Sequence, residues 1–411
     1  MANTNYFKYI CKKYLVKEGS FVKDITFLML HLNYGGIEKQ VSTLANELAK
    51  FKDRYTINIV SVYKINDEPF YELDPNIKIK YLMDRGPNKA EIKHALKTFN
   101  IFRLIIELFK GLNIVISKYS LMKKEIENLN TDIIVSSRIE FSKYIKRKDT
   151  LNISQEHSYI DSPSYIKKVR KSFRYIDYLV VMTEGAQKKY EQWLKYVDNA
   201  PKVVCIPNMI EDTQDDEICD ISSKNIVSVG RLEKVKDFES LVDVFNIVLK
   251  HYPDYKLNIV GEGHDRKNIE RKIRNYNLED KVIFKGRLNS EQVKQEMLKS
   301  CLFVLTSKSE SFSLVLCEAM SLGLPCVSFD VDMGPREIIK ENNTGFLIKN
   351  RNEERMAKRI IQLISNKDLS YEFSKEAQLA SNDFFAENMV KKWQILFLMK
   401  KHVERKLDFN I

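Results

Sequence analysis

The chain has 411 residues, of which 44% are hydrophobic and 30% charged, with only 13 Gly and 9 Pro. This composition excludes fibrous, collagen-like and disordered classes, and the length suits two domains of about 200 residues each. The net charge of +11 is uneven: residues 1–212 carry 35 Lys and Arg against 25 Asp and Glu, and the remainder carries 32 against 31. A basic first half favours an anionic partner, such as nucleic acid, a membrane surface or a phosphorylated acceptor, with a merely solvated basic surface as the alternative.

The sequence carries no sign of export or of membrane spanning. Residues 1–21 have no uninterrupted apolar core and no small-residue cleavage site, which excludes a signal peptide. No stretch of about 18 residues is free of charge, so we expect no transmembrane helix. The six cysteines are scattered without a C-x-x-C pair, which predicts free thiols in a cytoplasmic protein.

Short apolar runs alternate with helical patterns along the whole chain. The runs are rich in Val, Ile and Phe with little alternation, which is typical of parallel strands covered on both faces. Helical patterns of about 12 or more residues lie between most of them and indicate βαβ units, hence an α/β fold with doubly wound sheets. The predicted strands are Asp24–His31, Tyr55–Tyr63, Ile77–Leu82, Asp132–Ser137, Leu151–Glu156, Tyr178–Thr183, Val203–Pro207, Asn225–Gly230, Lys256–Val260, Lys281–Lys285, Leu302–Ser307 and Cys326–Phe329.

Two glycines, Gly35 and Gly36, follow the first predicted strand and precede a helix expected over Glu38–Lys50. Glycine lets the backbone approach a ligand closely, and the start of a helix offers free N–H groups and a positive dipole end. A doubly wound sheet binds phosphate at this place. The pair is therefore a candidate phosphate-binding turn, although a simple tight turn would have the same sequence.

The segment Lys89–Asn128 departs from the alternating pattern because it is long, basic and very apolar in its middle. In a helix, Asn100, Arg103, Glu107 and Lys110 share one stripe, and nearly everything else there is apolar. Such a helix is either a buried core helix or presents a face to a membrane or a lipid-linked acceptor.

A domain boundary is visible in the composition. Residues 211–217 are acidic and lack periodicity, and a fresh strand begins soon after. We therefore expect an N-terminal domain over 1–212 and a C-terminal domain over 213–385. The remaining segment, 386–411, contains a helix predicted over Glu387–Glu404 that crosses back to the N-terminal domain.

The loop after the first strand of the second half carries two cations, Arg231 and Lys236, within Gly230–Asp237. Fixed cations beside the start of a helix neutralise a diphosphate and stabilise its departure as a leaving group. A solvated basic turn is the alternative if this motif is taken alone.

A second loop carries a stronger pattern, Ser309–Met320, after the strand Leu302–Ser307. Glu310 lies in the loop, and Glu318 follows eight residues later, about two helical turns on. One carboxylate can bind sugar hydroxyls at the loop and the other ribose hydroxyls along the helix. The helix start at Ser313 presents N–H groups to phosphate.

At this point the chain resembles glycosyltransferase family 4, retaining enzymes of the GT-B architecture, in which two Rossmann-like domains face a central cleft. The resemblance covers roughly residues 24–385 and is most specific in the C-terminal half. The matching motifs, in order, are Gly35-Gly36, Glu156-His157, Pro207-Asn208, Gly230-Arg231-Leu232 with Lys236, Gly261-Glu262-Gly263, Gly286-Arg287, the pair Glu310 and Glu318, Gly334-Pro335-Arg336-Glu337 and Asn343-Thr344-Gly345-Phe346.

The resemblance implies a role for each matching residue. It makes His157, Arg231, Lys236 and Glu310 the catalytic set, with the two cations on the donor diphosphate, Glu310 on the transferred sugar and His157 reaching the sugar from the N-terminal domain. Glu318 would bind the ribose. The implied donor-binding residues are Gly35, Gly36, Gly230, Arg231, Lys236, Gly261, Arg287, Glu310, Ser311, Phe312, Ser313, Leu314 and Glu318.

Two positions depart from the family pattern. Asp237 replaces a usual Gly, and Ser313 stands where Gly or Pro is common. Both residues are good helix N-caps, so we expect the loops to keep their shape.

Metal and nicotinamide chemistry are disfavoured. Asp330 and Asp332 form a D-x-D, which holds a divalent metal in another glycosyltransferase architecture, but here the pair lies in the wrong sheet for that role. Gly261 and Gly263 match part of a dinucleotide fingerprint whose third Gly is absent. No Cys or His spacing suggests zinc. We expect no metal and no cofactor besides the nucleotide-sugar co-substrate.

The resemblance implies a transfer without a covalent nucleophile, in which the departing phosphate takes the acceptor's proton. The expected reaction moves a sugar from a nucleotide diphosphate, with UDP favoured by family habit, to a saccharide, lipid-linked or polymer acceptor of capsule, lipopolysaccharide or teichoic acid. The expected location is the cytoplasm, with peripheral contact between the N-terminal domain and an anionic inner membrane face.

The rival hypothesis is a non-catalytic partner of a glycosyltransferase complex. Loss of Arg231, Lys236 or Glu310 would indicate such a partner, and all three are present. A nucleic-acid binder is disfavoured because no recognised binding module is present.

Overall fold

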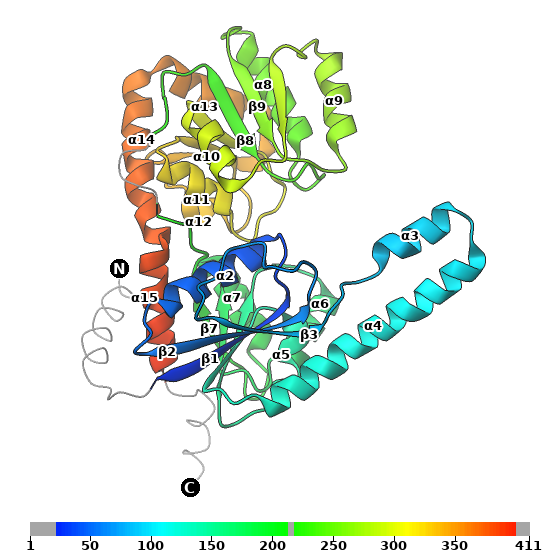
Figure 1. The fold of residues 1–411 in the computed structure, drawn as a ribbon. Coiled ribbons are helices and arrows are strands. Elements are labelled where there is room, and N and C mark those ends of the chain that lie inside the picture. The colour runs from blue at the N-terminus through cyan, green and yellow to red at the C-terminus, as the bar shows by residue number, and fades with distance from the viewer. Residues whose placement is uncertain (1–21, 213–217, 400–411) are drawn as a thin grey trace. The chain divides into compact units, whose positions relative to one another are not determined.

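The computed structural model of the chain describes residues 22–212 and 218–399, which divide into two compact units (Figure 1). Unit 1 comprises the described residues 22–182, 187–206 and 390–399, and unit 2 comprises 183–186, 207–212 and 218–389. Most of the expected linker, the cysteine at position 11 and the predicted end of the last helix up to Glu404 lie outside the described residues.

The described strands of unit 1 form one parallel sheet in the order β3-β2-β1-β4-β5-β6-β7. Strands β4 and β6 are buried along their whole length, as their unbroken apolar sequences require. The strands are β1 (Lys23–His31), β2 (Tyr55–Tyr63), β3 (Lys78–Met83), β4 (Ile133–Ser136), β5 (Leu151–Glu156), β6 (Tyr178–Val181) and β7 (Lys202–Cys205); the helices between them are α2 (Gly36–Ala49), α3 (Lys89–Lys97), α4 (Ile101–Asn128), α5 (Ile139–Ser142), α6 (Pro163–Ser172) and α7 (Glu184–Leu194).

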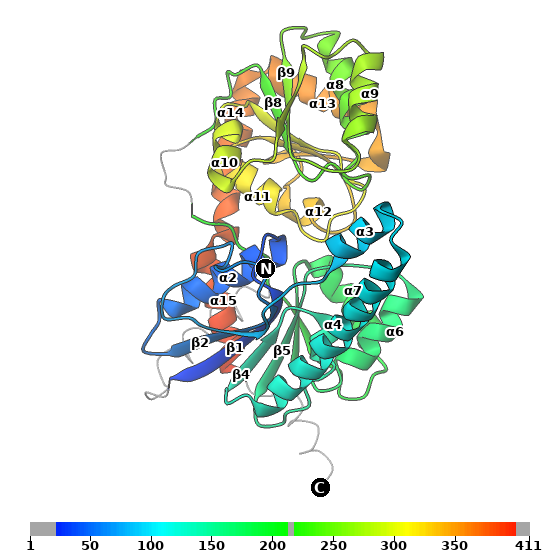
Figure 2. The ribbon, with the colours of Figure 1, turned by 45° about the vertical axis from the view of Figure 1, so that its right-hand side comes forward.

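The described strands of unit 2 form a second parallel sheet in the order β10-β9-β8-β11-β12-β13 (Figure 2). The sequence analysis missed β13, which begins at Gly345, because glycine is disfavoured in strands. The strands are β8 (Asn225–Val229), β9 (Lys256–Val260), β10 (Val282–Gly286), β11 (Leu302–Leu305), β12 (Cys326–Phe329) and β13 (Gly345–Ile348); the helices are α8 (Phe238–Leu249), α9 (Arg266–Asn275), α10 (Ser290–Leu298), α11 (Leu314–Ser321), α12 (Pro335–Ile338), α13 (Glu353–Ser365), α14 (Lys367–Ser381) and α15 (Ala386–Leu398), with short 3-10 turns at Lys349–Arg351 and Asn382–Phe384.

Each sheet reverses its strand order once. In unit 1 the reversal lies at β1, between β2 and β4, and in unit 2 at β8, between β9 and β11. These two Rossmann-like sheets confirm the predicted α/β fold class. Ligands of such sheets bind beyond the carboxyl ends of the strands beside the reversal. The loops after β1, β4, β8 and β11 are therefore the places to search for a site.

Helix α15 leaves unit 2 and joins unit 1 from Val390 onward. Trp393 is buried, and the ring of Phe397 meets the ring of Tyr55 edge to face at 6.0 Å. Lys23 Nζ donates a hydrogen bond to the Phe397 carbonyl. The last described helix therefore contributes to the core of the N-terminal unit.

Helices α3 and α4 form a hairpin between β3 and β4 that extends outward from the sheet of unit 1 (Figure 1). The alternative of a buried core helix is wrong for the first half of α4, where Phe102 is 77% exposed and Phe109 70% exposed. Within the described residues, none of the helices has the length and apolar character needed to cross a membrane.

Candidate functional site

The loops that follow β8, β9 and β10 are joined edge to edge at the carboxyl ends of their strands. Gly230 N donates to the Val260 carbonyl (2.9 Å), and Gly261 N donates to the Gly286 carbonyl (2.8 Å). A Cβ atom on Gly261, whose φ is +138°, would lie 1.9 Å from the Gly230 carbonyl oxygen, and one on Gly263 would lie 2.2 Å from a backbone oxygen. The Gly-Glu-Gly motif thus has a structural reason: only glycine permits this approach of two loops.

Lys236 and Glu310 meet across this edge from loops 74 residues apart in sequence. Lys236 Nζ donates to Glu310 Oε1 at 2.6 Å, and the hydroxyl of Ser307 donates to the same oxygen at 2.6 Å. The Glu310 side chain is 9% exposed and that of Lys236 is 21% exposed. A cation and a carboxylate are therefore held in one half-buried place, where a diphosphate and a sugar hydroxyl would find complementary partners.

Asp237 adopts a left-handed backbone conformation, with φ of +51°, which explains why glycine suits this position. It stands at the N-cap of α8, but its side chain makes no capping hydrogen bond, so the expected capping role is wrong. Its carboxylate instead accepts from Arg351 Nη2 at 2.6 Å and pairs with Lys308 at 3.4 Å.

Arg351 is a residue that the sequence analysis missed. Besides Asp237, its guanidinium donates to the Thr306 and Ser307 carbonyls at 2.9 and 2.7 Å and lies over the ring of Phe329. It thereby ties the Lys236 loop to the Glu310 loop. No local motif could have revealed it, because its hydrogen-bond partners lie 44 to 114 residues away.

Helix α11 begins at Leu314, directly after the Glu310 loop, and places Glu318 on its second turn. Phe312 is buried and packs edge to face against Phe384. Ser313 occupies the N-cap, but its buried hydroxyl has no hydrogen-bond partner, so the expected cap is wrong here too. An unpaired buried hydroxyl at the start of a helix is suited to a ligand oxygen.

Three other predicted donor-binding residues lie near these loops in sequence and structure. Arg231 is 70% exposed on its side chain and donates to Glu233 at 2.8 Å instead of contacting Glu310. Arg287 follows β10 and is exposed, and Ser311 is half-buried between Glu310 and Phe312. The structure thus brings Lys236 and Glu310 together and leaves Arg231 at the rim.

In unit 1, the Gly35-Gly36 turn leads into α2 as predicted, but it is partly filled by a carboxylate. A Cβ on Gly35 would lie 2.1 Å from Glu38 Oε2. Glu38 is buried and pairs with Arg138 at 3.3 Å and His31 at 3.4 Å. Burial lowers the pKa of His31, with Glu38 opposing this shift. This cluster at the ends of β1 and β4 was also missed.

His157 follows β5 at the same edge of the first sheet. Burial lowers the pKa of its imidazole to about 3, and the positive charge of Arg138 adds to the effect. Its Nε2 atom is buried without a hydrogen-bond partner. His157 is therefore a neutral imidazole at neutral pH. It can form a hydrogen bond with a ligand but does not act as a proton acceptor there.

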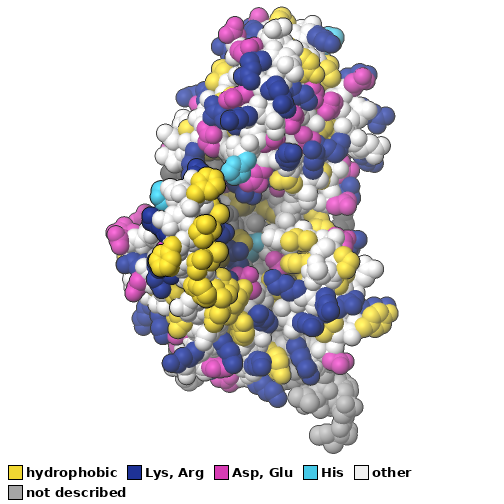
Figure 3. Space-filling view, turned by 90° about the vertical axis from the view of Figure 1, so that its right-hand side faces the viewer, with side chains coloured by type: hydrophobic (Ala, Val, Ile, Leu, Met, Phe, Trp, Pro, Cys, Tyr) yellow, Lys and Arg dark blue, Asp and Glu magenta, His cyan; other side chains and the backbone are white. Residues whose placement is uncertain are grey.

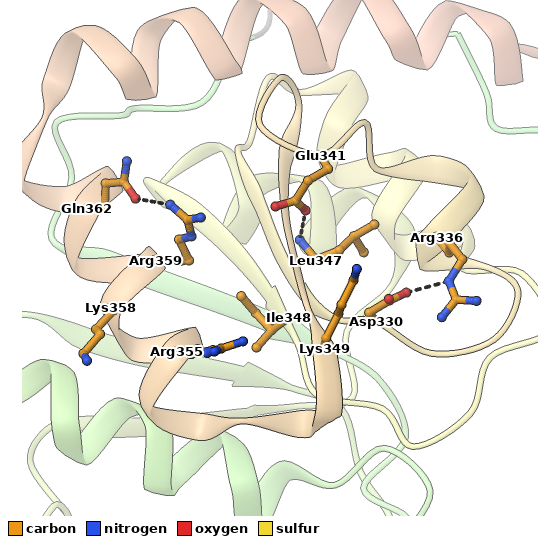
Figure 4. Close-up of a pocket in the computed structure, with 10 residues that line it drawn as sticks. All are labelled: Asp330, Arg336, Glu341, Leu347, Ile348, Lys349, Arg355, Lys358, Arg359 and Gln362. Carbon is orange, nitrogen blue, oxygen red and sulfur yellow. Dashed lines mark hydrogen bonds and ion pairs between the residues drawn. The ribbon is translucent and has the colours of Figure 1, made fainter.

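A cavity of about 900 Å³ opens beside the end of β13 and helix α13 (Figure 4). Cations dominate its wall, but it includes no predicted donor-binding residue.

Asp330 and Asp332 both accept hydrogen bonds from Arg336, at 2.7 and 3.2 Å, so the D-x-D pair is engaged with a cation. Across residues 22–212 and 218–399, no group of three or more His, Cys, Asp or Glu side chains is arranged to hold a metal ion.

Known proteins that resemble this chain in sequence and in structure belong to one class. The family model for "Glycosyl transferases group 1" matches residues 212–380. An uncharacterised glycosyltransferase of Haemophilus influenzae is 27% identical over 91% of this chain and 99% of its own length. The amylovoran biosynthesis glycosyltransferase AmsD of Erwinia amylovora is 26% identical over 88% of this chain and 95% of its own length.

Further relatives differ in length and named activity. A Campylobacter jejuni α-1,4-N-acetyl-D-galactosaminyltransferase, whose named substrate ends in PP-undecaprenol, is 25% identical over 90% of this chain and 96% of its own. A Streptomyces coelicolor exopolysaccharide phosphotransferase is 28% identical over 91% of this chain, which spans only 40% of that protein. Staphylococcus aureus TarM, solved with UDP, fondaparinux and α-GlcNAc-glycerol, matches with a TM-score of 0.71 and 19% identity over 92% of this chain and all of TarM.

The two doubly wound sheets and these matches define the class: the chain is a glycosyltransferase with the GT-B fold. Within that class, residues 212–380 belong to the glycosyl transferases group 1 family.

Proposed function

We propose that this chain is a metal-independent, retaining glycosyltransferase that moves a sugar from a UDP-sugar to a saccharide or lipid-linked acceptor in bacterial surface-polysaccharide synthesis. It would work at the cytoplasmic face of the membrane. The observation that carries the proposal is the half-buried pair of Lys236 and Glu310 at the carboxyl edge of the second sheet, 2.6 Å apart.

The charges at this edge suit a diphosphate leaving group. Lys236 and Arg231 come from one loop and supply two cations, while the start of α11 at Leu314 supplies backbone N–H groups. Glu310 would accept from hydroxyls of the transferred sugar and Glu318 from the ribose. These groups stabilise charge that develops on the diphosphate without a metal ion.

The proposed step breaks the bond between the anomeric carbon and the diphosphate oxygen and forms a bond from that carbon to the acceptor oxygen on the same face. The acceptor's proton passes to the departing phosphate oxygen, so the protein need not supply a general base. This fits His157, whose depressed pKa of about 3 makes it a hydrogen-bonding group and not a proton acceptor at neutral pH.

The acceptor class is proposed from the named relatives. AmsD is named for amylovoran biosynthesis, and the Campylobacter enzyme is named for a PP-undecaprenol-linked glycan. The uridine base is proposed from family habit and from TarM, which was solved with UDP.

Calorimetry with the purified full chain tests the donor site. UDP, GDP and ADP would each be titrated with and without magnesium. We expect UDP alone to bind, equally well without magnesium. Lys236→Ala and Glu318→Ala should each weaken UDP binding by about 10- to 100-fold, because each removes a charged hydrogen-bonding partner.

Lys234→Ala is the matched control, because Lys234 is exposed on the same loop and its loss removes the same charge. It should leave UDP affinity unchanged. Thermal melting of each variant would confirm that it is folded. Binding of no nucleotide by folded wild-type protein would favour a non-catalytic partner, and binding that requires magnesium would contradict metal independence.

A further inference from the structure

The first half of α4 and the turn before it expose an unusually large hydrophobic surface. Figure 3 shows these side chains as a continuous band with Lys and Arg beside it. Soluble proteins rarely expose contiguous apolar patches larger than a few hundred Å² unless the patch binds something. We name this surface the α4 apolar face; it comprises Leu96, Phe99, Ile101, Phe102, Ile105, Ile106, Leu108, Phe109, Leu112, Val115 and Ile116.

The apolar face follows the helical period, because Phe102, Phe109 and Ile116 recur at intervals of seven residues. The opposite side of the same turns is occupied: Glu107 and Ile114 are buried, and Glu107 accepts from the Asn88 side chain at 2.9 Å. Residues 101–116 thus form an amphipathic helix about 24 Å long, with one side packed and the other apolar and open.

The apolar character ends where α4 reaches the body of unit 1. Met122 and Ile126 are fully buried there, and Lys80 pairs with Glu125 at 2.7 Å. Ser120 points in nearly the same direction as Phe109, three turns earlier, but is polar. The hydrophobic surface is therefore confined to the part of the helix that extends beyond the sheet.

The charge around the apolar face is predominantly positive. From residue 92 to 124 the sequence contains a single carboxylate, Glu107, and that side chain is buried against Lys110. The exposed cations on α3 and the first half of α4 are Lys89, Lys93, Lys97, Arg103 and Lys110, against one exposed carboxylate, Glu91, in the first turn of α3. An apolar face with a predominantly cationic rim matches the interface of an anionic lipid bilayer, where acyl chains lie beneath negative headgroups.

We propose that the α3–α4 hairpin docks into the headgroup region of an anionic membrane, with α4 lying in the plane of the bilayer. Phe99, Phe102 and Phe109 would enter the acyl boundary while the Lys and Arg residues bind lipid phosphates. A symmetric contact with a second copy fits less well, because it would bring two cationic rims together.

Vesicle flotation with the full chain tests this docking. We expect wild-type protein to float with vesicles of phosphatidylglycerol and phosphatidylcholine at low salt, and to float poorly with phosphatidylcholine alone. Phe109→Asp should reduce the bound fraction at least about 10-fold, since it removes a ring that would be buried in the bilayer and adds a charge that anionic lipid repels. High salt should weaken binding by screening.

Ser120→Asp is the matched control, because it adds the same charge on the same side of α4 outside the apolar face; it should float like wild type. Equal loss in both variants, or equal flotation with neutral and anionic vesicles, would overturn the proposal. The proposal would also be overturned if wild-type protein does not bind vesicles but sediments as a dimer, and Phe109→Asp dissociates that dimer. Flotation needs no nucleotide, so its failure leaves the donor-site proposal standing, and failed UDP binding leaves this one standing.

Discussion

The carboxyl edges of the two sheets are built in different ways. In unit 2 most of the edge is closed by the protein itself: glycine contacts join neighbouring loops, and Lys236, Glu310 and Ser307 hydrogen-bond to one another. The buried Ser313 hydroxyl is the exception, because it has no hydrogen-bond partner within the described part of the chain. In unit 1, buried polar atoms at the corresponding edge lack partners among the described residues, including Arg138 Nε and His157 Nε2. Unsatisfied buried groups are rare and mark places where a ligand supplies the missing bonds.

The difference teaches that one edge is preorganised and the other is completed by substrate. A preorganised edge suits a charged diphosphate, because the protein groups that bind the charge must be in position before the ligand arrives. An edge where a guanidinium N–H and a neutral imidazole are unpaired suits the hydroxyls of a ligand. Substitutions that disturb one edge and leave the other intact test whether the two edges differ in this way.

The largest effect is expected from Gly261→Ala. The new methyl group would lie 1.9 Å from the Gly230 carbonyl oxygen, and the φ of +138° is strained for alanine. We expect the free energy of unfolding of unit 2 to fall by about 3 kcal/mol or more, measured by urea denaturation.

Gly36→Ala is the counterpart in unit 1, where a Cβ would meet nothing within 4 Å. It should leave stability unchanged or raise it by up to about 1 kcal/mol. Similar losses in the two variants would show that the glycine contacts do not distinguish the two edges.

The second effect concerns Arg351, the positioning residue behind the Lys236–Glu310 pair. Arg351→Ala removes hydrogen bonds to Asp237 and to the Thr306 and Ser307 carbonyls. Charged hydrogen bonds contribute about 1.5–3 kcal/mol each, so we expect UDP affinity to fall about 10- to 100-fold in calorimetry.

Arg351→Lys should restore little affinity, because an ammonium group cannot reach all three acceptors in the fork geometry of arginine. Arg355→Ala, at an exposed arginine one turn into α13, is the control and should bind UDP normally. Weakened binding in both variants would point to general loss of positive charge instead of positioning.

The features that depend on local sequence patterns, namely the strands and the two loops that carry Lys236 and Glu310, could be predicted from the sequence. Twelve short apolar runs indicated strands because parallel strands buried on both faces have a distinct composition. Lys236 and Glu310 were predicted from separate loops, and the fold brings them into contact.

Other features depend on contacts that sequence spacing does not encode. Arg351 binds Asp237 from 114 residues away, and Arg138 binds Glu38 from 100 residues away. Ser313 and Asp237 have the right identity for N-caps, but the left-handed φ of Asp237 and its ion pair with Arg351 override local propensity. The composition of the segment around Phe102 left a core helix and an exposed face both open, because composition does not determine what covers a helix.

The smallest effect concerns His157, at the edge of unit 1, and is measured through the pH dependence of stability. Below its ordinary pKa of 6.5, His157 takes up a proton in the unfolded chain but not in the folded one, whose pKa is about 3. Stability is therefore fully present above pH 6.5 and is lost as pH falls toward 3. Between pH 6.5 and 5 we expect this one group to cost roughly 1–2 kcal/mol.

His157→Gln should flatten that decline, measured as the free energy of unfolding from urea titrations at several pH values. His31, whose pKa burial also lowers, and Glu156, whose pKa burial raises, act in opposite directions and remain in the variant, so the difference from wild type isolates His157. His251→Gln, at an exposed position in unit 2, should follow wild type. An unchanged slope in His157→Gln would mean that the imidazole keeps its ordinary pKa in the folded chain, and burial would then not hold this group neutral below pH 6.5.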